Sequence, residues 1–146
     1  MGMSAPVSLP EPLNNEHQIG TFDSGEPVLD EWLGRRARVN QASDASRTYV
    51  VCEGKVVVGY YALASGAVTQ ATAPGRFRRN MPDPIPVVVL ARLAVDKRFQ
   101  GRGLGRALFR DAARRIAHAA DTVGIREIVV HAIYGGGAAG LYCAWF

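Results

Sequence analysis

The sequence predicts an α/β (α+β) layer fold, a mixed sheet covered by helices, and three observations support this. Two runs rich in β-branched and aromatic residues, 48–52 and 56–64, are separated by a short turn. The very apolar segment 87–95 comes before an amphipathic helical pattern. A further strand pattern follows that helix at 125–133. The predicted order β, α, β, β, β, α, β is typical of a layered domain.

The N-terminal part predicts a short strand and one helix before the first hairpin. Residues 18–22 form the short strand candidate. Asp23 or Ser24 can cap a helix that we expect to run to about Asn40. The turn Glu53-Gly54-Lys55 then joins the two runs as a hairpin. The apolar face of the helix consists of Val28, Leu29, Trp32, Leu33 and Ala37.

The second half predicts a loop, a central strand, a long helix and another strand. Three prolines between 82 and 86 exclude regular structure, so residues 66–86 are expected to be a loop. Segment 87–95 reads as a central strand buried on both faces. The helix that follows carries Leu104, Leu108, Ala112 and Ile116 every four residues, with Phe109 beside this row and with Arg106, Arg110 and Arg114 off it.

Composition limits the kind of protein that this chain can be. Its 146 residues, 48% hydrophobic and 21% charged, suit one globular domain. No apolar stretch approaches the roughly 20 residues of a membrane span, and the first residues do not resemble a secretory signal, so we expect a cytoplasmic protein without membrane contact. Two cysteines and three histidines lack ligand spacing, so no metal is expected. A net charge of +4, mostly from arginine, suits a phosphate-bearing partner.

Three glycines at alternate positions stand where the central strand gives way to the long helix. The stretch reads Arg98-Phe-Gln-Gly-Arg-Gly-Leu-Gly-Arg106. Glycines let backbone amides approach a ligand closely, and the start of a helix favours an anion, so the segment predicts a phosphate site. It matches neither a P-loop nor the G-x-G-x-x-G of a dinucleotide fold. A flexible strand-to-helix turn without a ligand is the alternative interpretation.

Gln100-Gly-Arg-Gly-Leu-Gly105 resembles the Q/R-x-x-G-x-G/A signature of the GNAT superfamily of N-acetyltransferases. The chain is similar, more narrowly, to the TacT-type toxins of type II toxin–antitoxin systems, over roughly residues 8 to 133. This resemblance implies a single GNAT domain over residues 1–146 with a mostly antiparallel central sheet. The matching blocks are Phe22–Glu26, Leu29–Leu33, Val58–Leu63, Arg78–Pro86 and Ala91–Val95.

The resemblance implies that the chain transfers an acetyl group from acetyl-CoA to the α-amino group of aminoacyl-tRNA, which blocks translation. The cofactor pyrophosphate would bind the glycine loop, and the pantetheine arm would bond the central strand beside a bulge. The implied cofactor-binding residues are Leu93, Ala94, Val95, Gln100, Gly101, Arg102, Gly103, Leu104, Gly105 and Arg106. Arginines suited to tRNA phosphates are Arg36, Arg78, Arg79 and Arg92.

A catalytic acid is implied in the C-terminal tail. In the family it is a tyrosine in the helix after the last buried strand, and Tyr142 is the best match, with Tyr134 as its rival. The tail departs from the family pattern at Tyr134-Gly-Gly-Gly137, and each glycine costs a helix about 1 kcal/mol. The tail therefore reads as altered, with an incomplete C-terminus, which puts catalytic competence in question.

The resemblance also implies a homodimer and a small antitoxin with a ribbon-helix-helix DNA-binding domain. Two other functions stay open at this point. One is an N-acetyltransferase of a small amine or a protein N-terminus, which would use the same cofactor loop. The other is a catalytically impaired form that still binds the cofactor or the antitoxin.

Overall fold

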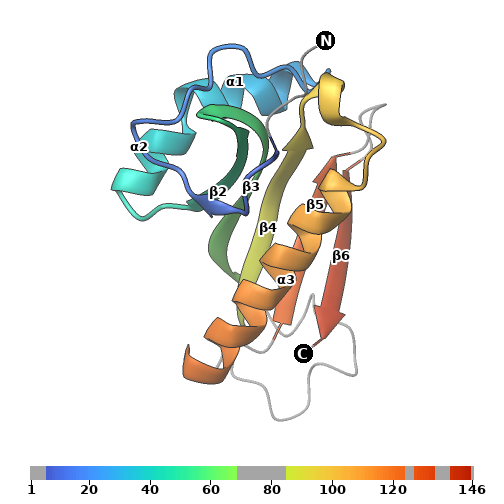
Figure 1. The fold of residues 1–146 in the computed structure, drawn as a ribbon. Helices are drawn as coiled ribbons and strands as arrows, with labels where there is room; N and C mark the ends of the chain where they lie inside the picture. The colour runs from blue at the N-terminus through green and yellow to red at the C-terminus, as the bar shows by residue number, and fades with distance from the viewer. Residues whose placement is uncertain (1–5, 69–84, 124–126, 134–138, 146) are drawn as a thin grey trace.

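The computed structural model describes residues 6–68, 85–123, 127–133 and 139–145, and its elements form one six-stranded sheet with helices on both sides (Figure 1). The strands stand in chain order from β1 to β6, and every neighbouring pair is antiparallel except β4 and β5. This confirms a mixed, mostly antiparallel sheet. The elements are β1 (Glu11–Pro12), α1 (Pro27–Arg35), α2 (Ala37–Ala42), β2 (Arg47–Glu53), β3 (Val56–Val68), β4 (Ile85–Val95), the 3-10 helix η2 (Lys97–Phe99), α3 (Leu104–Val123), β5 (Glu127–Ile133) and β6 (Ala139–Trp145).

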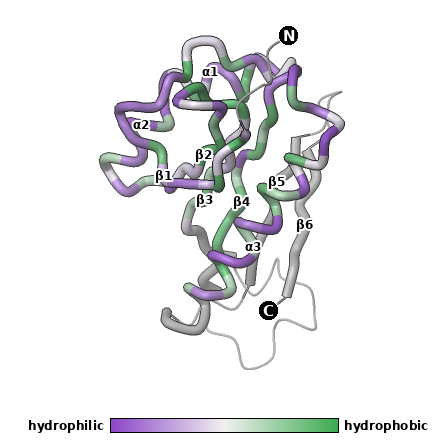
Figure 2. The backbone as a smooth tube through the Cα atoms, viewed as in Figure 1, coloured by the Kyte–Doolittle hydropathy of each residue, from purple (hydrophilic) through white to green (hydrophobic). Residues whose placement is uncertain are grey.

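The sheet separates two hydrophobic clusters. Consecutive strand residues point to opposite faces, so Tyr60 packs with Trp32 of α1 while Tyr61 lies on the face that carries Leu108 of α3. All four of these side chains are buried. Figure 2 shows the hydrophobic residues concentrated on the strands between the helices. One face of the sheet therefore carries α1 and α2, and the opposite face carries α3.

The hairpin is confirmed, with the predicted turn between β2 and β3. Gly54 at the turn has a φ of +64°, which glycine adopts readily. The expected loop 66–86 is too wide, because Gly66 pairs with Val87 and Val68 pairs with Ile85. The hydrogen bonds between β3 and β4 extend both strands beyond the residues whose own sequence pattern predicts a strand. Residues 69–84 lie outside the described part of the chain.

The predicted strand at residues 18–22 is wrong. In the described part of the chain only one bridge forms there, between Gln18 and Val56, and the strand that comes first is instead Glu11–Pro12 on the edge of β2. The reason is that the Phe22 N–H closes a turn onto the Ile19 carbonyl at 3.2 Å. This backbone is therefore used in a turn and cannot form a ladder.

The single helix expected up to Asn40 is two helices, because the backbone departs from helical geometry at Arg36 (φ −115°, ψ −31°). Gly34 weakens the turn just before the break. The predicted caps are also wrong: Glu26 is the N-cap, and Ser24 bonds Asp30 instead. Leu29, Trp32, Leu33 and Ala37 are buried as predicted, whereas Val28 is 61% exposed.

Replacing Gly34 with alanine should stabilise the protein. A Cβ at this position meets no atom within 4 Å, and alanine favours a helix over glycine by about 0.5–1 kcal/mol. Thermal unfolding should show a Tm raised by about 2 °C. Gly59→Ala is the control of opposite sign, because its Cβ would lie 2.9 Å from Val51 Cγ2 and 3.1 Å from Leu108 Cδ1. A Gly34→Ala variant that unfolds earlier than the wild type would contradict this interpretation.

The long helix agrees with prediction. The central strand is confirmed, but between residues 88 and 95 only Leu90 and Ala94 are buried and the other residues are half-buried. On α3 the residues Leu108, Ala112 and Ile116 are buried and Leu104 is partly buried, while Arg106, Arg110 and Arg114 are exposed. Phe109, which the sequence pattern places beside the apolar row, is 42% exposed. Within the described residues, no helix is both long and apolar enough to cross a membrane.

The C-terminal helix expected around Tyr142 is wrong, because residues 139–145 form β6. This strand pairs antiparallel with β5, from Ala139 opposite Ile133 to Trp145 opposite Glu127. Pairing gives the backbone groups along that edge of β5 their partners. The glycines of this tail disfavour a helix, which removes the competing structure.

Candidate functional site

The ladder between β4 and β5 ends partway along β4, and the term slot is used for the unpaired edge of β4 beyond that point. These parallel strands are paired from Val87 to Leu90, and the pairing ends at Leu90 opposite Val130. A bulge follows at once, because Ala62 pairs with Arg92 while Leu63 pairs with Leu90, which leaves Ala91 as the extra residue. Among the described residues, β4 beyond the bulge is paired only with β3. The edge of β4 away from β3, at residues 92–95, therefore borders the slot.

The alternation of hydrogen-bonding direction along β4 determines which of its residues point their backbone N–H and C=O groups into the slot. The Asp96 N–H donates to the Val58 carbonyl on β3 at 2.9 Å. Because alternate residues of a strand bond to opposite neighbours, Ala94, which is paired with Tyr60, also directs its backbone to β3. Leu93 and Val95 direct theirs into the slot. Of the three strand residues predicted to bind a cofactor, these two have backbone groups on the open side.

The glycine loop lies at the end of this slot. Gly101 and Gly103 have φ values of +78° and +81°, and a Cβ on either would meet nothing within 4 Å. Helix α3 begins at Leu104, so its first N–H groups have no partner inside the helix. Gly105 packs against the strand, because its Cβ would lie 3.7 Å from Val95 Cγ2. The loop amides and the slot are therefore adjacent, as an anion site beside an extended ligand requires.

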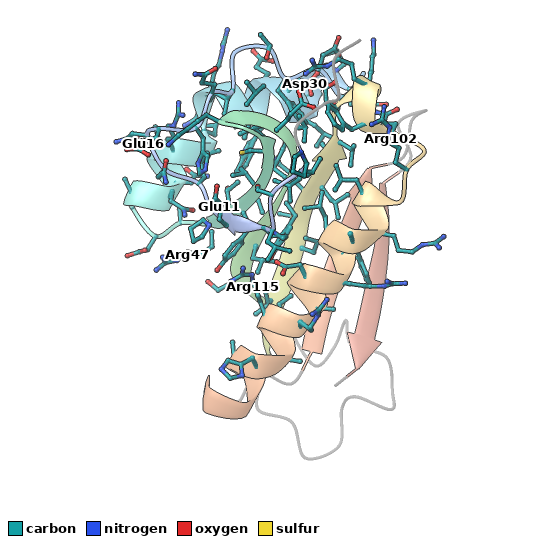
Figure 3. All side chains as sticks on the ribbon, in the orientation of Figure 1. Glu11, Glu16, Asp30, Arg47, Arg102 and Arg115 are labelled. Carbon is teal, nitrogen blue, oxygen red and sulfur yellow. The ribbon has the colours of Figure 1, made fainter. Side chains whose placement is uncertain are left out.

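Arginine flanks this loop on its exposed side. Arg102 is exposed, and its guanidinium lies 5.1 Å from the centre of the Phe99 ring. Figure 3 shows Arg102 at the end of the molecule where α3 begins. Beside it is a hollow of about 230 Å³, lined by Val7, Phe99, Arg102, Gly103, Leu104 and Ala107. The next arginine, Arg106, is also exposed in the first turn of α3.

A second hollow lies on the α1 face of the sheet, and Arg92 forms part of its wall. The Arg92 guanidinium lies 4.5 Å from the centre of the Trp32 ring. The Trp32 ring stacks on the Tyr60 ring, with 5.9 Å between the ring centres. Arg92 Nε is buried and finds no hydrogen-bond partner among the described residues, and burial lowers the pKa of this side chain. The hollow is lined by Val28, Glu31, Trp32, Arg35, Arg36 and Arg92. Two of the predicted RNA-binding residues, Arg36 and Arg92, are thus brought together.

Arg78, Arg79 and Tyr134 lie outside the described residues, and for Tyr142 the structure gives the backbone position. Tyr142 stands opposite Val130 on β5, and Val130 stands opposite Leu90 on β4. The three residues therefore form one row across the sheet, which reaches β4 next to the bulge at Ala91. This row ends at the point where the slot opens.

Asp96 is a buried carboxylate at the end of β4 that no sequence motif singles out. It is 2% exposed and accepts hydrogen bonds from the N–H groups of Asp23 at 3.1 Å and Arg98 at 3.0 Å, and from Arg98 Nε at 3.1 Å. Burial alone would raise the pKa of Asp96, but these bonds and the Arg98 charge hold it below its ordinary value. Ionised Asp96 therefore stabilises the folded state.

Stability at low pH should depend on Asp96. Because the pKa of Asp96 is lower in the folded state than in the unfolded state, its contribution is complete above about pH 4 and is lost as the pH falls through the depressed value. Urea unfolding between about pH 6 and about pH 2.5 should show the free energy of unfolding falling less with acid in Asp96→Asn than in the wild type. Equal slopes in the two proteins would rule out this role.

A cluster of three potential metal ligands, Glu11, His17 and Cys52, has no signature in the sequence spacing. Their ligand atoms lie within 4.8 Å of one another. However, the Asn14 N–H donates to His17 Nδ1 at 3.0 Å, so the proton of the neutral ring is on Nε2, which donates to Glu11 Oε1 at 2.8 Å. Nε2 then has no lone pair for a metal. Burial also raises the pKa of the Cys52 thiol to about 11, so the cluster suits a hydrogen-bonded tether of the N-terminal segment.

Known proteins share the sequence pattern and the fold of this chain. A family model described as the Acetyltransferase (GNAT) family matches residues 13–142. A curated tRNA-acetylating toxin of Mycobacterium tuberculosis (strain ATCC 25618 / H37Rv) is 53% identical over 127 residues, which are 87% of this chain and 76% of that protein.

Solved structures share the fold at lower identity. The structure of AtaT complexed with acetyl-methionyl-tRNAfMet superposes with a TM-score of 0.80 at 28% identity, covering 88% of this chain and 79% of that one. A second structure holds a mutant AtaT toxin bound to the C-terminus of the antitoxin AtaR and acetyl-CoA. It superposes with a TM-score of 0.74 at 28% identity, over 88% of this chain and 76% of that one.

Proposed function

We propose, since the chain belongs to the acetyltransferase (GNAT) family, that it is a toxin that transfers the acetyl group of acetyl-CoA to the α-amino group of aminoacyl-tRNA and so blocks translation. The observation that supports this best is the slot beside β4. The glycine loop stands at its end, and the arginine-lined hollow at Arg92 is only one residue from Leu93. The proposed cofactor site and the proposed anion-binding face therefore share one strand, in a chain 53% identical to a tRNA-acetylating toxin.

Acetyl-CoA is held in this proposal by backbone groups on one side of the slot. The pantetheine amides bond to Leu93 and Val95, and Ala94 between them keeps the strand attached to β3. The pyrophosphate lies on the amides of the loop and the first turn of α3, where the helix dipole favours negative charge. The residues concerned are Gln100, Gly101, Arg102, Gly103, Leu104, Gly105 and Arg106, within one GNAT domain that spans residues 1–146.

The chemistry requires few groups. The neutral α-amine of the aminoacyl ester attacks the thioester carbonyl, forming a C–N bond, and the C–S bond then breaks to release the CoA thiolate. The amine loses one proton and the thiolate gains one. A phenol, with an ordinary pKa near 10, is protonated at neutral pH and can donate to the thiolate. We assign this role to Tyr142, in the strand row that ends at the slot.

The acceptor RNA approaches the α1 face in this proposal. Arg92 is fixed by its stacking on Trp32, which removes the need to order a flexible side chain on binding. Arg36 lines the same hollow and is exposed. Glu31 is paired with Arg35 at 3.2 Å, which leaves the other two arginines of the hollow for phosphates. With Arg78 and Arg79, they form the proposed phosphate-binding set.

Removing the charge of Arg36 should weaken RNA binding and reduce its dependence on salt. Each lost phosphate contact lowers the slope of log K against log [salt] by about 1. Filter binding of bulk tRNA over a salt series should show this for Arg36→Gln. Arg114→Gln removes the same charge from the exposed side of α3 and should leave the slope unchanged. Equal slopes for the two variants would exclude the α1 face as the RNA site.

The proposed partners follow from the proposed activity. We propose a homodimer in the cytoplasm, where charged tRNA is found, neutralised by a small antitoxin with a ribbon-helix-helix domain. The likeness to AtaT bound to the C-terminus of AtaR supports an antitoxin partner. A monomer in light scattering would argue against the dimer. If the product of neither adjacent gene co-purifies with the chain, the antitoxin proposal fails.

One transfer assay separates the candidate functions. The chain is incubated with radiolabelled acetyl-CoA and, in parallel, with charged tRNA, small amines and peptides. Label in the RNA fraction that is lost on hydrolysis of the aminoacyl ester supports the proposal. Label in the small amines or peptides would indicate an ordinary N-acetyltransferase. Cofactor binding without transfer to any acceptor would indicate the catalytically impaired form.

A further inference from the structure

The side-chain amide of Gln100 lies where the slot, the glycine loop and the segment before α1 meet. Its Nε2 donates to the carbonyl oxygens of Ser24 and Val95, each at 2.8 Å. Both acceptors are oxygens, so the amide group must present its nitrogen to them. A single side chain therefore joins the end of β4 to Ser24, which lies 76 residues before Gln100 in the chain.

Neighbouring contacts hold the same two segments together. The Lys97 N–H donates to the Asp23 carbonyl at 2.8 Å, and the Asp23 N–H donates to the Asp96 carboxylate at 3.1 Å. The Lys97 ammonium also lies 3.6 Å from the Asp23 carboxylate. Asp23 and Ser24 are thus bonded to residues 96–100 through backbone and side chains.

The earlier segment is in turn fixed to α1. The N–H and hydroxyl of Ser24 donate to Asp30 Oδ1 at 3.0 Å and 2.6 Å. Figure 3 shows Asp30 of α1 and Arg102 of the glycine loop at the same end of the molecule. Further along α1, two and five residues after Asp30, Trp32 and Arg35 line the hollow at Arg92. A continuous path of hydrogen bonds therefore leads from the glycine loop to the helix of the proposed acceptor face.

We propose that Gln100 is a positioning residue that couples the glycine loop to α1. Binding of the cofactor at the loop then also holds α1, the helix of the proposed acceptor face, in place. The inference rests on the proposed function, because it takes the slot as the cofactor site. Val95 is central to it: its backbone faces the slot, and its carbonyl is the group that Gln100 bonds. A ligand that forms a hydrogen bond with the Val95 N–H therefore restrains the residue whose carbonyl accepts the hydrogen bond from Gln100. Coupling of this kind acts equally in both directions.

Hydrogen exchange of the full chain with and without coenzyme A tests the coupling. In the wild type, saturating coenzyme A should slow the exchange of amides in residues 23–35 by about tenfold, within the usual range for coupled sites. Gln100→Glu keeps the backbone amide assigned to the pyrophosphate and nearly the same side-chain size, but it has no N–H to donate to the two carbonyls, so this effect should disappear at coenzyme A concentrations that saturate the variant. Gln100→Arg keeps N–H donors and should retain the protection. Slower exchange of residues 23–35 should therefore require a side-chain N–H donor at position 100, and a long side chain without such a donor should not be enough.

The outcomes separate the inference from the function that it assumes. Calorimetry first establishes that each protein binds coenzyme A, and circular dichroism establishes that each is folded. Gln100→Ala, which lacks the donor and adds no charge, should repeat the result of Gln100→Glu. The coupling is refuted, and the cofactor site stands, if the wild type binds coenzyme A without any change in the exchange of residues 23–35. The same conclusion follows if Gln100→Glu and Gln100→Ala keep the full protection. If the wild type does not bind coenzyme A, both proposals fail.

Discussion

Gly103→Val should weaken binding of acetyl-CoA by about 10²-fold or more. Gly103 has a φ of +81°, a region that a β-branched residue adopts only with strain, so valine forces the loop into another conformation. Its Cβ also enters open space that the proposed phosphate requires. Losing two hydrogen bonds to a charged group, at about 1.5–3 kcal/mol each, corresponds to at least this factor. Isothermal titration calorimetry with acetyl-CoA measures it.

Gly54→Val is the matched control. Gly54 also has a positive φ, of +64°, and also faces open space, but it lies in the hairpin turn between β2 and β3. The two variants therefore carry similar backbone strain. Both should lose stability, and Gly54→Val should still bind acetyl-CoA like the wild type. If Gly103→Val also binds like the wild type, the glycine loop is only a turn, as the alternative interpretation of its sequence holds.

Tyr142→Phe should lower turnover by roughly 10²-fold while the affinity for acetyl-CoA stays nearly the same. Phenylalanine keeps the ring but has no proton to donate to the departing thiolate, and general acid catalysis contributes about 10²–10⁴. Single-turnover acetylation of charged tRNA measures the rate, and calorimetry measures the affinity.

Tyr49→Phe gives a control for loss of a phenol elsewhere, because Tyr49 stacks on Tyr61 under α3, away from the slot. Its turnover should match that of the wild type. Full activity of Tyr142→Phe would exclude this residue as the acid, and either solvent or Tyr134 would then protonate the thiolate.

Local sequence signals predicted the parts of the fold that depend on neighbouring residues. The hairpin turn at Gly54, the apolar strand β4 and the four-residue spacing on α3 each have a cause within a short window. The glycine loop belongs to the same group, because a strand, three glycines and a helix follow one another directly. Its place at the end of the slot follows from that order.

Features set by distant contacts could not be predicted in this way. The strand β6 forms because β5 offers an edge, whereas the family resemblance implies a helix for the same residues. The helix break at Arg36 has only the weak signal of Gly34 before it. The resemblance assigns Gln100 to the cofactor, yet its side chain bonds Ser24, and no local pattern connects those two positions. The same holds for Asp23 and Asp96.

The measurement that tests the proposed activity most directly is the chemical identity of the acetylated product. Charged tRNA treated with the chain and acetyl-CoA is digested to nucleosides, and the 3′-terminal aminoacyl-adenosine is analysed by mass spectrometry. We predict one added acetyl group on the α-amino nitrogen of the amino acid. An unmodified aminoacyl-adenosine, from an enzyme that demonstrably binds acetyl-CoA, would contradict the proposal.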